Sequence, residues 1–129
     1  MSSIFSKIVK GEIPCYKIAE NDEFLAFLDI MPLSKGHTLV IPKQETDYIF
    51  DIEDAVLGRM HIFSKSVAKK IEKVIPCNRI GVSVIGLEVP HAHIHLIPMN
   101  SVSDMNFSKP KLKFSKEEMN QIAEEIRKA

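Results

Sequence analysis

The chain has 129 residues, of which 45% are hydrophobic and 26% are charged, with 17 lysines and arginines against 17 aspartates and glutamates. This length predicts a single domain over residues 1–129 with one hydrophobic core. The balanced charge excludes a strong electrostatic attraction to nucleic acid or to an anionic membrane surface, but it is compatible with a local phosphate site.

The cysteines and the hydropathy pattern point to a reducing compartment. Cys15 and Cys77 lie far apart and form no CxxC motif, which is typical of idle thiols. The N-terminal segment has no apolar stretch of the kind found in secretory signals, and no apolar run approaches the ~20 residues that cross a bilayer. We therefore expect a cytoplasmic protein without a membrane segment.

The first part of the chain predicts a short helix and three strands. Ser2 or Ser3 can cap a helix over IFSKIVKGE, which Gly11 would end. The stretches YKIAE and EFLAFLDI, joined at Asn21-Asp22, predict a hairpin. HTLVIP predicts a third strand after the loop MPLSKG, and the polar, acidic connection KQETDYIFDIE follows it.

The second part predicts a long helix, two strands and a terminal helix. Apolar residues recur at spacings of three, four and seven from about residue 53 to residue 74. RIGVSVIGLEV predicts a strand with a turn near Gly86, and HAHIHLIPM predicts the next strand. Ser115 and Glu118 have the spacing of a capping box for the last helix. The order of elements indicates an α+β fold: an antiparallel sheet, one long central helix, a short N-terminal helix and a C-terminal helix.

Three of the five histidines, His91, His93 and His95, alternate with Ala92, Ile94 and Leu96. In a strand this alternation would place the imidazoles on one face and the apolar side chains in the core. The pattern by itself leaves three interpretations open. They are a solvated strand face, a zinc site with Glu88 nearby, and phosphoryl chemistry with imidazole as nucleophile and hydrogen-bond donor.

The stretch HAHIHLIP fits the H-φ-H-φ-H-φ-φ motif of the histidine triad family of nucleotide hydrolases and transferases, where φ is an apolar residue. IFSKIVKGEIP and FLAFLDIMPLSKGHTLVIPK also resemble the N-terminal half of that family, in the same order and spacing. The resemblance covers about residues 4–98. It leaves residues 99–129 as a C-terminal extension and helix similar to the tails of bacterial members. The likeness is greatest to the nucleoside phosphoramidase branch.

This resemblance implies the histidine-triad fold and a nucleotide hydrolase that needs no cofactor and no metal. It would act at the α-phosphate of nucleoside phosphoramidates or related AMP conjugates through a nucleotidyl-histidine intermediate, and release a nucleoside monophosphate. His93 would be the nucleophile, and His95 would donate a hydrogen bond to a phosphate oxygen. His91 would orient the nucleophile through the second ring nitrogen of His93, and His37 would lie beside the site.

The resemblance also implies binding residues for a purine nucleotide. Asp29 would bind the ribose hydroxyls. The base would be held by the apolar side chains of Ile30, Ile4, Phe5 and Ile8.

The segment before the triad, GVSVIGLEVPH, departs from the family pattern of Asn-x-Gly followed by Gly-Gln. Leu87 stands where Gln is common, Glu88 stands where Ser or Thr is common, and Ser83 is a candidate replacement for the asparagine. A carboxylate at Glu88 favours a cationic leaving amine over a second polyphosphate. Three alternatives stay open: a dinucleoside polyphosphate hydrolase, a nucleotide-binding regulator with incidental turnover, and a zinc-dependent hydrolase that uses the same histidines.

The family is usually a homodimer whose sheet continues across the two-fold axis. The predicted central helix also has more apolar residues than contact with one small sheet can bury. Ile62 and Phe63 flank the row of apolar residues that would face the sheet. We therefore expect a symmetric dimer in which this helix and a sheet edge meet their mates.

Overall fold

Five strands form one antiparallel sheet in the order β1-β2-β3-β5-β4. The computed structural model describes residues 2–129. The strands are β1 (Lys17–Glu20), β2 (Phe24–Leu28), β3 (Thr38–Pro42), β4 (Arg79–Ser83) and β5 (Ile94–Met99). The helices are α1 (Ile4–Val9), α2 (Asp54–Val74) and α3 (Lys116–Lys128), and two short 3₁₀ helices are η1 (Ile49–Asp51) and η2 (Val102–Met105). The predicted α+β fold is therefore confirmed.

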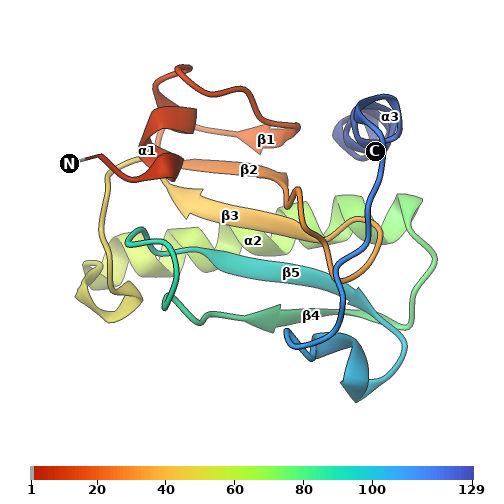
Figure 1. The fold of residues 1–129 in the computed structure, drawn as a ribbon. Coiled ribbons are helices and arrows are strands. Elements are labelled where there is room, and N and C mark those ends of the chain that lie inside the picture. Colours follow the sequence, from red (N-terminus) through yellow and green to blue (C-terminus); the bar gives the residue numbers. More distant parts are fainter. Residues whose placement is uncertain (1) are drawn as a thin grey trace.

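The two faces of the sheet carry different helices (Figure 1). On the face behind the sheet in this view, α2 packs on the inward side chains of β2, β3 and β5, and α3 packs on β1, β2 and α2 to complete the main core. That core includes Phe24, Val40, Ile94, Val67, Ile71 and Ile126, each 0% exposed. On the other face, Phe5 of α1 packs on Leu25, Phe27, Leu39 and Ile41. This second face is the one on which His95 lies, since His95 pairs with Leu39 across the β3–β5 ladder and paired residues share a face.

The helix caps form as the sequence predicts. Ser3 accepts a hydrogen bond from the backbone N–H of Ser6 and so caps α1. Ser115 and Glu118 form a complete capping box at the start of α3. Each cap satisfies backbone donors that the first helical turn would leave unpaired. Among residues 2–129, no helix combines the length and apolarity that a bilayer crossing requires.

Two predicted strands are shorter than expected. The predicted strand over residues 91–99 begins only at Ile94, so His91 and His93 precede β5 and only His95 lies within it. The reason is that Ala92 N–H donates to the Thr46 oxygen and His91 N–H to the Val89 oxygen, which leaves these groups outside the sheet ladder. The predicted alternation is retained in part, because Ala92, Ile94 and Leu96 all lie in the main core.

The predicted strand over residues 79–89 ends at Ser83. Residues 84–88 leave the sheet, and Gly86 has a φ of 73°, a conformation that glycine adopts without steric cost. The turn predicted near Gly86 is therefore present, but the strand does not resume after it. This segment leads instead into the irregular stretch that carries His91 and His93.

Candidate active site

The protonation state of His93 can be read from its hydrogen bond. Its Nδ1 lies 2.8 Å from the backbone oxygen of His91. A carbonyl oxygen only accepts, so Nδ1 carries the proton and donates it. In the neutral ring the lone pair is then on Nε2, the nitrogen that can act as a nucleophile.

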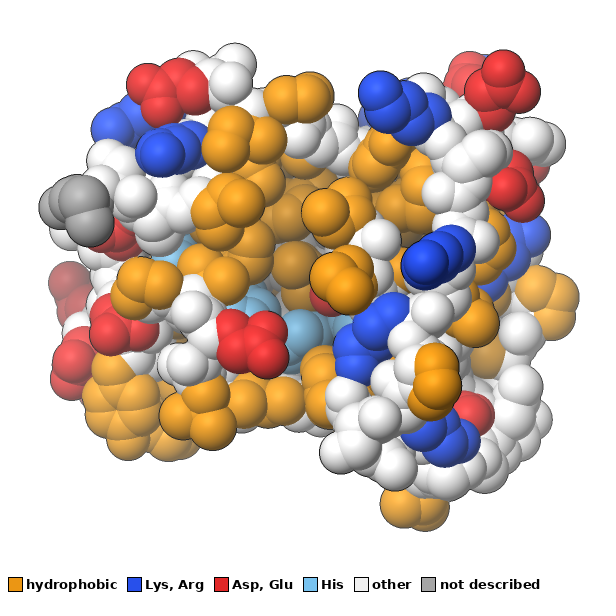
Figure 2. Space-filling view, viewed as in Figure 1, with side chains coloured by type: hydrophobic (Ala, Val, Ile, Leu, Met, Phe, Trp, Pro, Cys, Tyr) orange, Lys and Arg blue, Asp and Glu red, His pale blue; other side chains and the backbone are white. Residues whose placement is uncertain are grey.

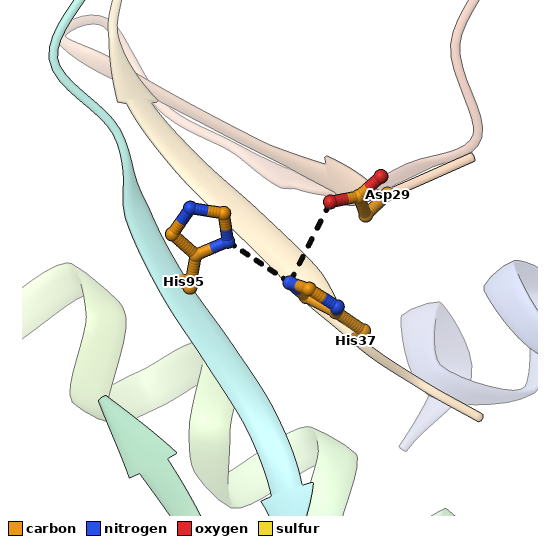
Figure 3. Close-up of side chains that lie close together, drawn as sticks. All are labelled: Asp29, His37 and His95. Carbon is orange, nitrogen blue, oxygen red and sulfur yellow. Dashed lines mark hydrogen bonds and ion pairs between the residues drawn. The ribbon is translucent and has the colours of Figure 1, made fainter. Parts of the chain in front are cut away.

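His95 and His37 form a chain of hydrogen bonds that also fixes their protons (Figure 3). The backbone N–H of Leu33 donates to Nδ1 of His37 at 3.0 Å, so the proton of neutral His37 is on Nε2. That Nε2 lies 2.9 Å from Nδ1 of His95 and donates to it. The proton of neutral His95 is therefore on its own Nε2, where it can donate to a ligand. The His93 and His95 ring centroids are 4.9 Å apart, so a lone pair and an N–H donor stand side by side.

Burial keeps these imidazoles neutral. Desolvation, reinforced by the neighbouring histidines, lowers the pKa of His37 to about 3 and that of His95 to about 4, from an ordinary value of 6.5. The pKa of His91 is also lowered, chiefly by burial, although the Pro42 carbonyl and the charge of Glu45 oppose the shift. The proton positions assigned to His37, His91 and His95 therefore hold at neutral pH.

The ring of His91 does not touch the His93 ring nitrogen. Its Nε2 donates to the Pro42 backbone oxygen at 2.8 Å, and its Nδ1 lies 2.7 Å from Oγ of Ser3. The bond to Nδ1 of His93 comes from the His91 main chain. The contact expected between His91 and the second ring nitrogen of His93 is present, but the backbone oxygen makes it and the imidazole does not.

Asp29 lies at the end of β2, beside His37. Its Oδ1 accepts from Met31 N–H at 2.8 Å, and its Oδ2 is 3.6 Å from Nε2 of His37. Burial raises the pKa of the Asp29 carboxyl, and the Met31 hydrogen bond opposes that shift. Because His37 is neutral at neutral pH, the 3.6 Å approach is not an ion pair. The Asp29 carboxylate is left free to accept from hydroxyl groups of a ligand.

Asp29, His37 and His95 also bring three candidate metal-ligand atoms within 4.8 Å of one another. A metal needs the lone pair of each ligating imidazole nitrogen. Here the Leu33 N–H occupies Nδ1 of His37, so Nε2 of His37 holds a proton rather than a lone pair. The donor set does not fit a metal in the arrangement observed.

The four apolar residues expected to hold a base fall into two groups. Phe5 is 7% exposed and packs edge-on against the His93 ring, with 5.1 Å between the ring centroids. Ile8, which is also on α1, packs against the apolar cluster that contains Phe5. Ile4 and Ile30 are 51% and 73% exposed. Phe5 therefore supports the His93 ring, and the exposed isoleucines offer apolar surface for a ligand.

Ser83 and Glu88 flank the triad from the segment that departs from the family pattern. Ser83 pairs with His95 across the β4–β5 ladder, so the two side chains share a face of the sheet. Glu88 is exposed, and its charge acts on Asp29 in the direction that raises the Asp29 pKa. The helical His61 is exposed on α2, where its ring contacts only the Leu57 carbonyl of its own helix.

Two residues of the segment between β5 and α3, Phe107 and Lys111, approach the site. The ring centroid of Phe107 lies 4.9 Å from that of His95 and 6.3 Å from that of His37. Lys111 Nζ donates to the Phe107 and Lys109 backbone oxygens and lies 5.8 Å from the Phe107 ring centroid. Its charge lowers the pKa of both Asp29 and His37. A long-range hydrogen bond from Leu112 N–H to the Pro32 oxygen, in the loop between β2 and β3, holds this segment beside the site.

Figure 2 shows the histidine side chains at the bottom of a hollow on the α1 side of the molecule. Hydrophobic side chains border the hollow above, an acidic side chain stands on one side and basic side chains stand on the other. A ligand at this site therefore meets apolar surface, charges of both signs and two oriented imidazoles.

The sequence matches the HIT domain over residues 10–102. It is 40% identical over 129 residues to the adenosine 5'-monophosphoramidase hnt1 of Schizosaccharomyces pombe, covering 98% of this chain and 96% of that protein. It is 38% identical over 100 residues to the adenosine 5'-monophosphoramidase HNT1 of Saccharomyces cerevisiae, covering 74% of this chain and 61% of that protein.

Solved structures share the fold. A Hit-like protein of Bartonella henselae superposes with a TM-score of 0.85 at 30% identity, over 98% of this chain and 95% of that one. A zinc-bound histidine triad family protein of Mycobacterium smegmatis superposes with a TM-score of 0.81 at 26% identity, over 99% of this chain and 92% of that one.

Proposed function

The chain belongs to the HIT domain family of histidine triad proteins, and we propose that it hydrolyses nucleoside phosphoramidates and related AMP conjugates at the α-phosphate. The observation that carries this proposal is the pair of oriented imidazoles. Nε2 of His93 has a lone pair, and Nε2 of the adjacent His95 has a proton. The names of the two yeast relatives describe adenosine 5'-monophosphoramidases, and this supports the same chemistry here.

In the first step, Nε2 of His93 attacks the α-phosphorus, a bond forms between them, and the bond from phosphorus to the leaving nitrogen breaks. The His93 ring becomes cationic, so its Nδ1–H bond to the His91 oxygen becomes charge-assisted and stronger. His95 donates Nε2–H to a phosphate oxygen as negative charge develops there. Water then attacks the same phosphorus and loses a proton to solvent, the bond from phosphorus to Nε2 of His93 breaks, and the nucleoside monophosphate leaves with His93 neutral again.

The leaving amine departs with a proton that comes from neither of the other two triad imidazoles. The His91 ring is occupied by Ser3 and Pro42. His95, with a pKa of about 4, holds only the single Nε2–H proton at neutral pH and serves as a hydrogen-bond donor. An amine that is already protonated in the bound conjugate, or that takes a proton from solvent at the hollow, fits this arrangement.

We also propose the binding roles that the family resemblance implies. Asp29 accepts hydrogen bonds from the ribose hydroxyls through the carboxylate that His37 leaves unpaired. The exposed side chains of Ile4 and Ile30 contact a purine base, with Phe5 and Ile8 beneath them. Ser83 and Glu88 stand on the leaving-group side.

Capture of the intermediate tests the proposal. The protein is mixed with adenosine 5'-phosphoramidate, quenched within one turnover and analysed by intact and peptide mass spectrometry. We expect a mass increase of one adenylyl group on the peptide that contains His93. The matched control, His61→Ala, changes an exposed histidine outside the site and should form the same adduct. Release of AMP without any adduct, or an adduct on another residue, would refute the covalent route through His93.

A further inference from the structure

A second hydrogen-bonded cluster lies behind the triad and joins three separate parts of the chain. Oε1 of Glu45, in the connection after β3, accepts from Ser3 N–H at 2.6 Å and from Ser6 Oγ at 2.7 Å. Ser3 Oγ lies 2.7 Å from Nδ1 of His91, which is 88 residues away. Ser3, Ser6 and His91 are 6%, 7% and 0% exposed. The cluster therefore ties α1 to the triad through buried side chains.

The direction of every hydrogen bond in the cluster follows from its partners. His91 Nε2 donates to the Pro42 oxygen, so Nδ1 of the neutral ring has a lone pair and must accept. Ser6 Oγ lies 3.4 Å from that Nδ1 but uses its proton on Glu45 at 2.7 Å. The remaining donor is the hydroxyl of Ser3, whose oxygen at the same time accepts from Ser6 N–H.

Glu45 determines which serine donates a hydrogen bond to His91. Hydrogen bonds from Ser3 and Ser6 lower the pKa of the Glu45 carboxyl to about 2, so it is ionised at neutral pH. An ionised carboxylate only accepts, and it holds the Ser6 proton away from His91. Without Glu45 the Ser6 hydroxyl would be free to compete for the same lone pair.

The backbone of His91 is held at the same place. Ala92 N–H donates at 2.7 Å to the backbone oxygen of Thr46, the residue that follows Glu45 in the sequence. The ring of His91 is fixed by Ser3 and Pro42, and its peptide bond to Ala92 is fixed by Thr46. The His91 carbonyl therefore points toward Nδ1–H of His93.

We propose that Ser3 and Glu45 are positioning residues for the nucleophile: they fix the His91 ring with its proton on Nε2 and so hold the His91 carbonyl against Nδ1–H of His93. This inference rests on the proposed function, because its consequence is the rate at which His93 attacks. Neither residue needs to contact the substrate.

The experiment compares Ser3→Ala, Ser3→Thr and Glu45→Ala with wild type. Imidazole ¹⁵N chemical shifts, measured without substrate, report which nitrogen of each ring is protonated. We expect wild-type His91 to be protonated on Nε2 and wild-type His93 on Nδ1. In Ser3→Ala we expect mixed protonation of both rings and a fall in kcat of about tenfold, because a buried acceptor loses its donor. Ser3→Thr keeps the hydroxyl and should restore both readouts. Ser2→Ala is the matched control, since the Ser2 hydroxyl is exposed and bonds only to Lys10.

Glu45→Ala provides the second variant if Ser3→Ala does not fold, because the Glu45 side chain lies at the surface. It should alter the ¹⁵N pattern of His91 and lower kcat in the same direction. A wild-type kcat in both variants, or a fall in kcat with both ¹⁵N patterns unchanged, would overturn the positioning role. If wild type itself fails to hydrolyse AMP amidates, the proposed function fails, while the ¹⁵N shifts still decide the hydrogen-bond assignment.

Discussion

Single hydrogen atoms determine what each histidine of this site can do. The three triad imidazoles and His37 are all buried, yet they differ in which ring nitrogen is protonated. His93 is protonated on Nδ1 because a carbonyl accepts there, and the other three are protonated on Nε2. The hydrogen-bond partners, and not the residue type, therefore determine which ring nitrogen has a lone pair and which has a proton.

Removal of the nucleophile should separate binding from turnover. His93→Ala is expected to abolish hydrolysis of AMP amidates while AMP binding stays within a few-fold of wild type, because Asp29 and the apolar wall are unchanged. Calorimetric AMP titration and single-turnover kinetics would measure the two effects. A kcat above a few per cent of wild type in His93→Ala would contradict nucleophilic attack by this residue.

The pKa values of His37 and His95 predict acid-sensitive stability. Both are lowered in the folded chain, to about 3 and about 4, so the unfolded chain binds these protons more tightly. Their contribution to the unfolding free energy is complete above the unfolded pKa of 6.5 and is lost as pH falls toward the folded values. Each group adds a slope of at most about 1.4 kcal/mol per pH unit in that window.

Urea unfolding between about pH 7 and about pH 5 measures this slope. His37→Gln should reduce it, because that variant no longer has to keep a buried imidazole neutral. His61→Gln removes an exposed histidine and should leave the slope as in wild type. Identical slopes in His37→Gln and wild type would contradict the assignment.

At the level of secondary structure elements, the segment between β5 and α3 supplies charge that the triad motif lacks. It contains η2 and crosses the sheet so that Phe107 lies against His95 and Lys111 lies near Asp29. From the sequence, the carboxylate of Glu88 favoured a cationic leaving amine. Lys111 adds one positive charge near the site, and its effect on the pKa of Asp29 is opposite to that of the negative charge of Glu88.

This arrangement predicts a preference among substrates. We expect kcat/KM for AMP–amine conjugates to exceed that for diadenosine tri- or tetraphosphate by at least about tenfold, which needs only ~1.4 kcal/mol of transition-state preference. One lysine does not provide the bidentate contacts that hold a polyphosphate chain well. Side-by-side kinetics would measure the ratio, and equal or reversed constants would favour a polyphosphate hydrolase.

Lys111→Met should widen this ratio. A polyphosphate has more negative charges than the amine conjugate, so removal of a positive charge weakens its binding more. Lys113→Met is a matched control two residues further along the segment. A similar ratio in both variants would show that Lys111 does not select the substrate.

For the whole molecule, one edge of the sheet has several exposed apolar side chains nearby. The strand β4 ends the sheet, so one side of its backbone has no partner strand among residues 2–129. Exposed apolar side chains occur on β4 and in the segments around it: Tyr48, Phe50, Val82, Val84 and Ile85. Ile62, on α2, is exposed as well. A hollow of about 360 Å³ lies between residues 47–50 and 84–86. An open sheet edge with apolar surroundings is typical of an interface.

We therefore propose a symmetric dimer through β4 and α2. Light scattering at micromolar concentration should give twice the 14.6 kDa chain mass. The double change Ile62→Asp and Val84→Asp should give the single-chain mass, because it places four like charges at a two-fold interface. Val102→Asp, at a more exposed apolar position on η2, should remain dimeric. A wild-type mass of one chain would exclude this assembly.

The sequence by itself determined everything that depends on near neighbours in the chain. The Ser3 cap, the Ser115–Glu118 capping box and the periodicity of α2 each involve residues within one or two helical turns, and all three are confirmed. The triad motif likewise predicted the family, because its spacing is local. The strand over residues 91–99 was predicted too long, because the bond from Ala92 to Thr46 that removes its first residues from the sheet is not local.

Only the tertiary structure decided which hydrogen bonds connect the residues of the site. The proton on His95 is set by His37, 58 residues away, and the ring of His91 is set by Ser3, 88 residues away. Phe107 and Lys111 approach the triad because Leu112 N–H donates to the oxygen of Pro32, in the loop between β2 and β3. A protonation state depends on which donor or acceptor lies within about 3 Å of a ring nitrogen. That distance is fixed by the packing of α1, β3 and β5 together, which no single stretch of sequence specifies.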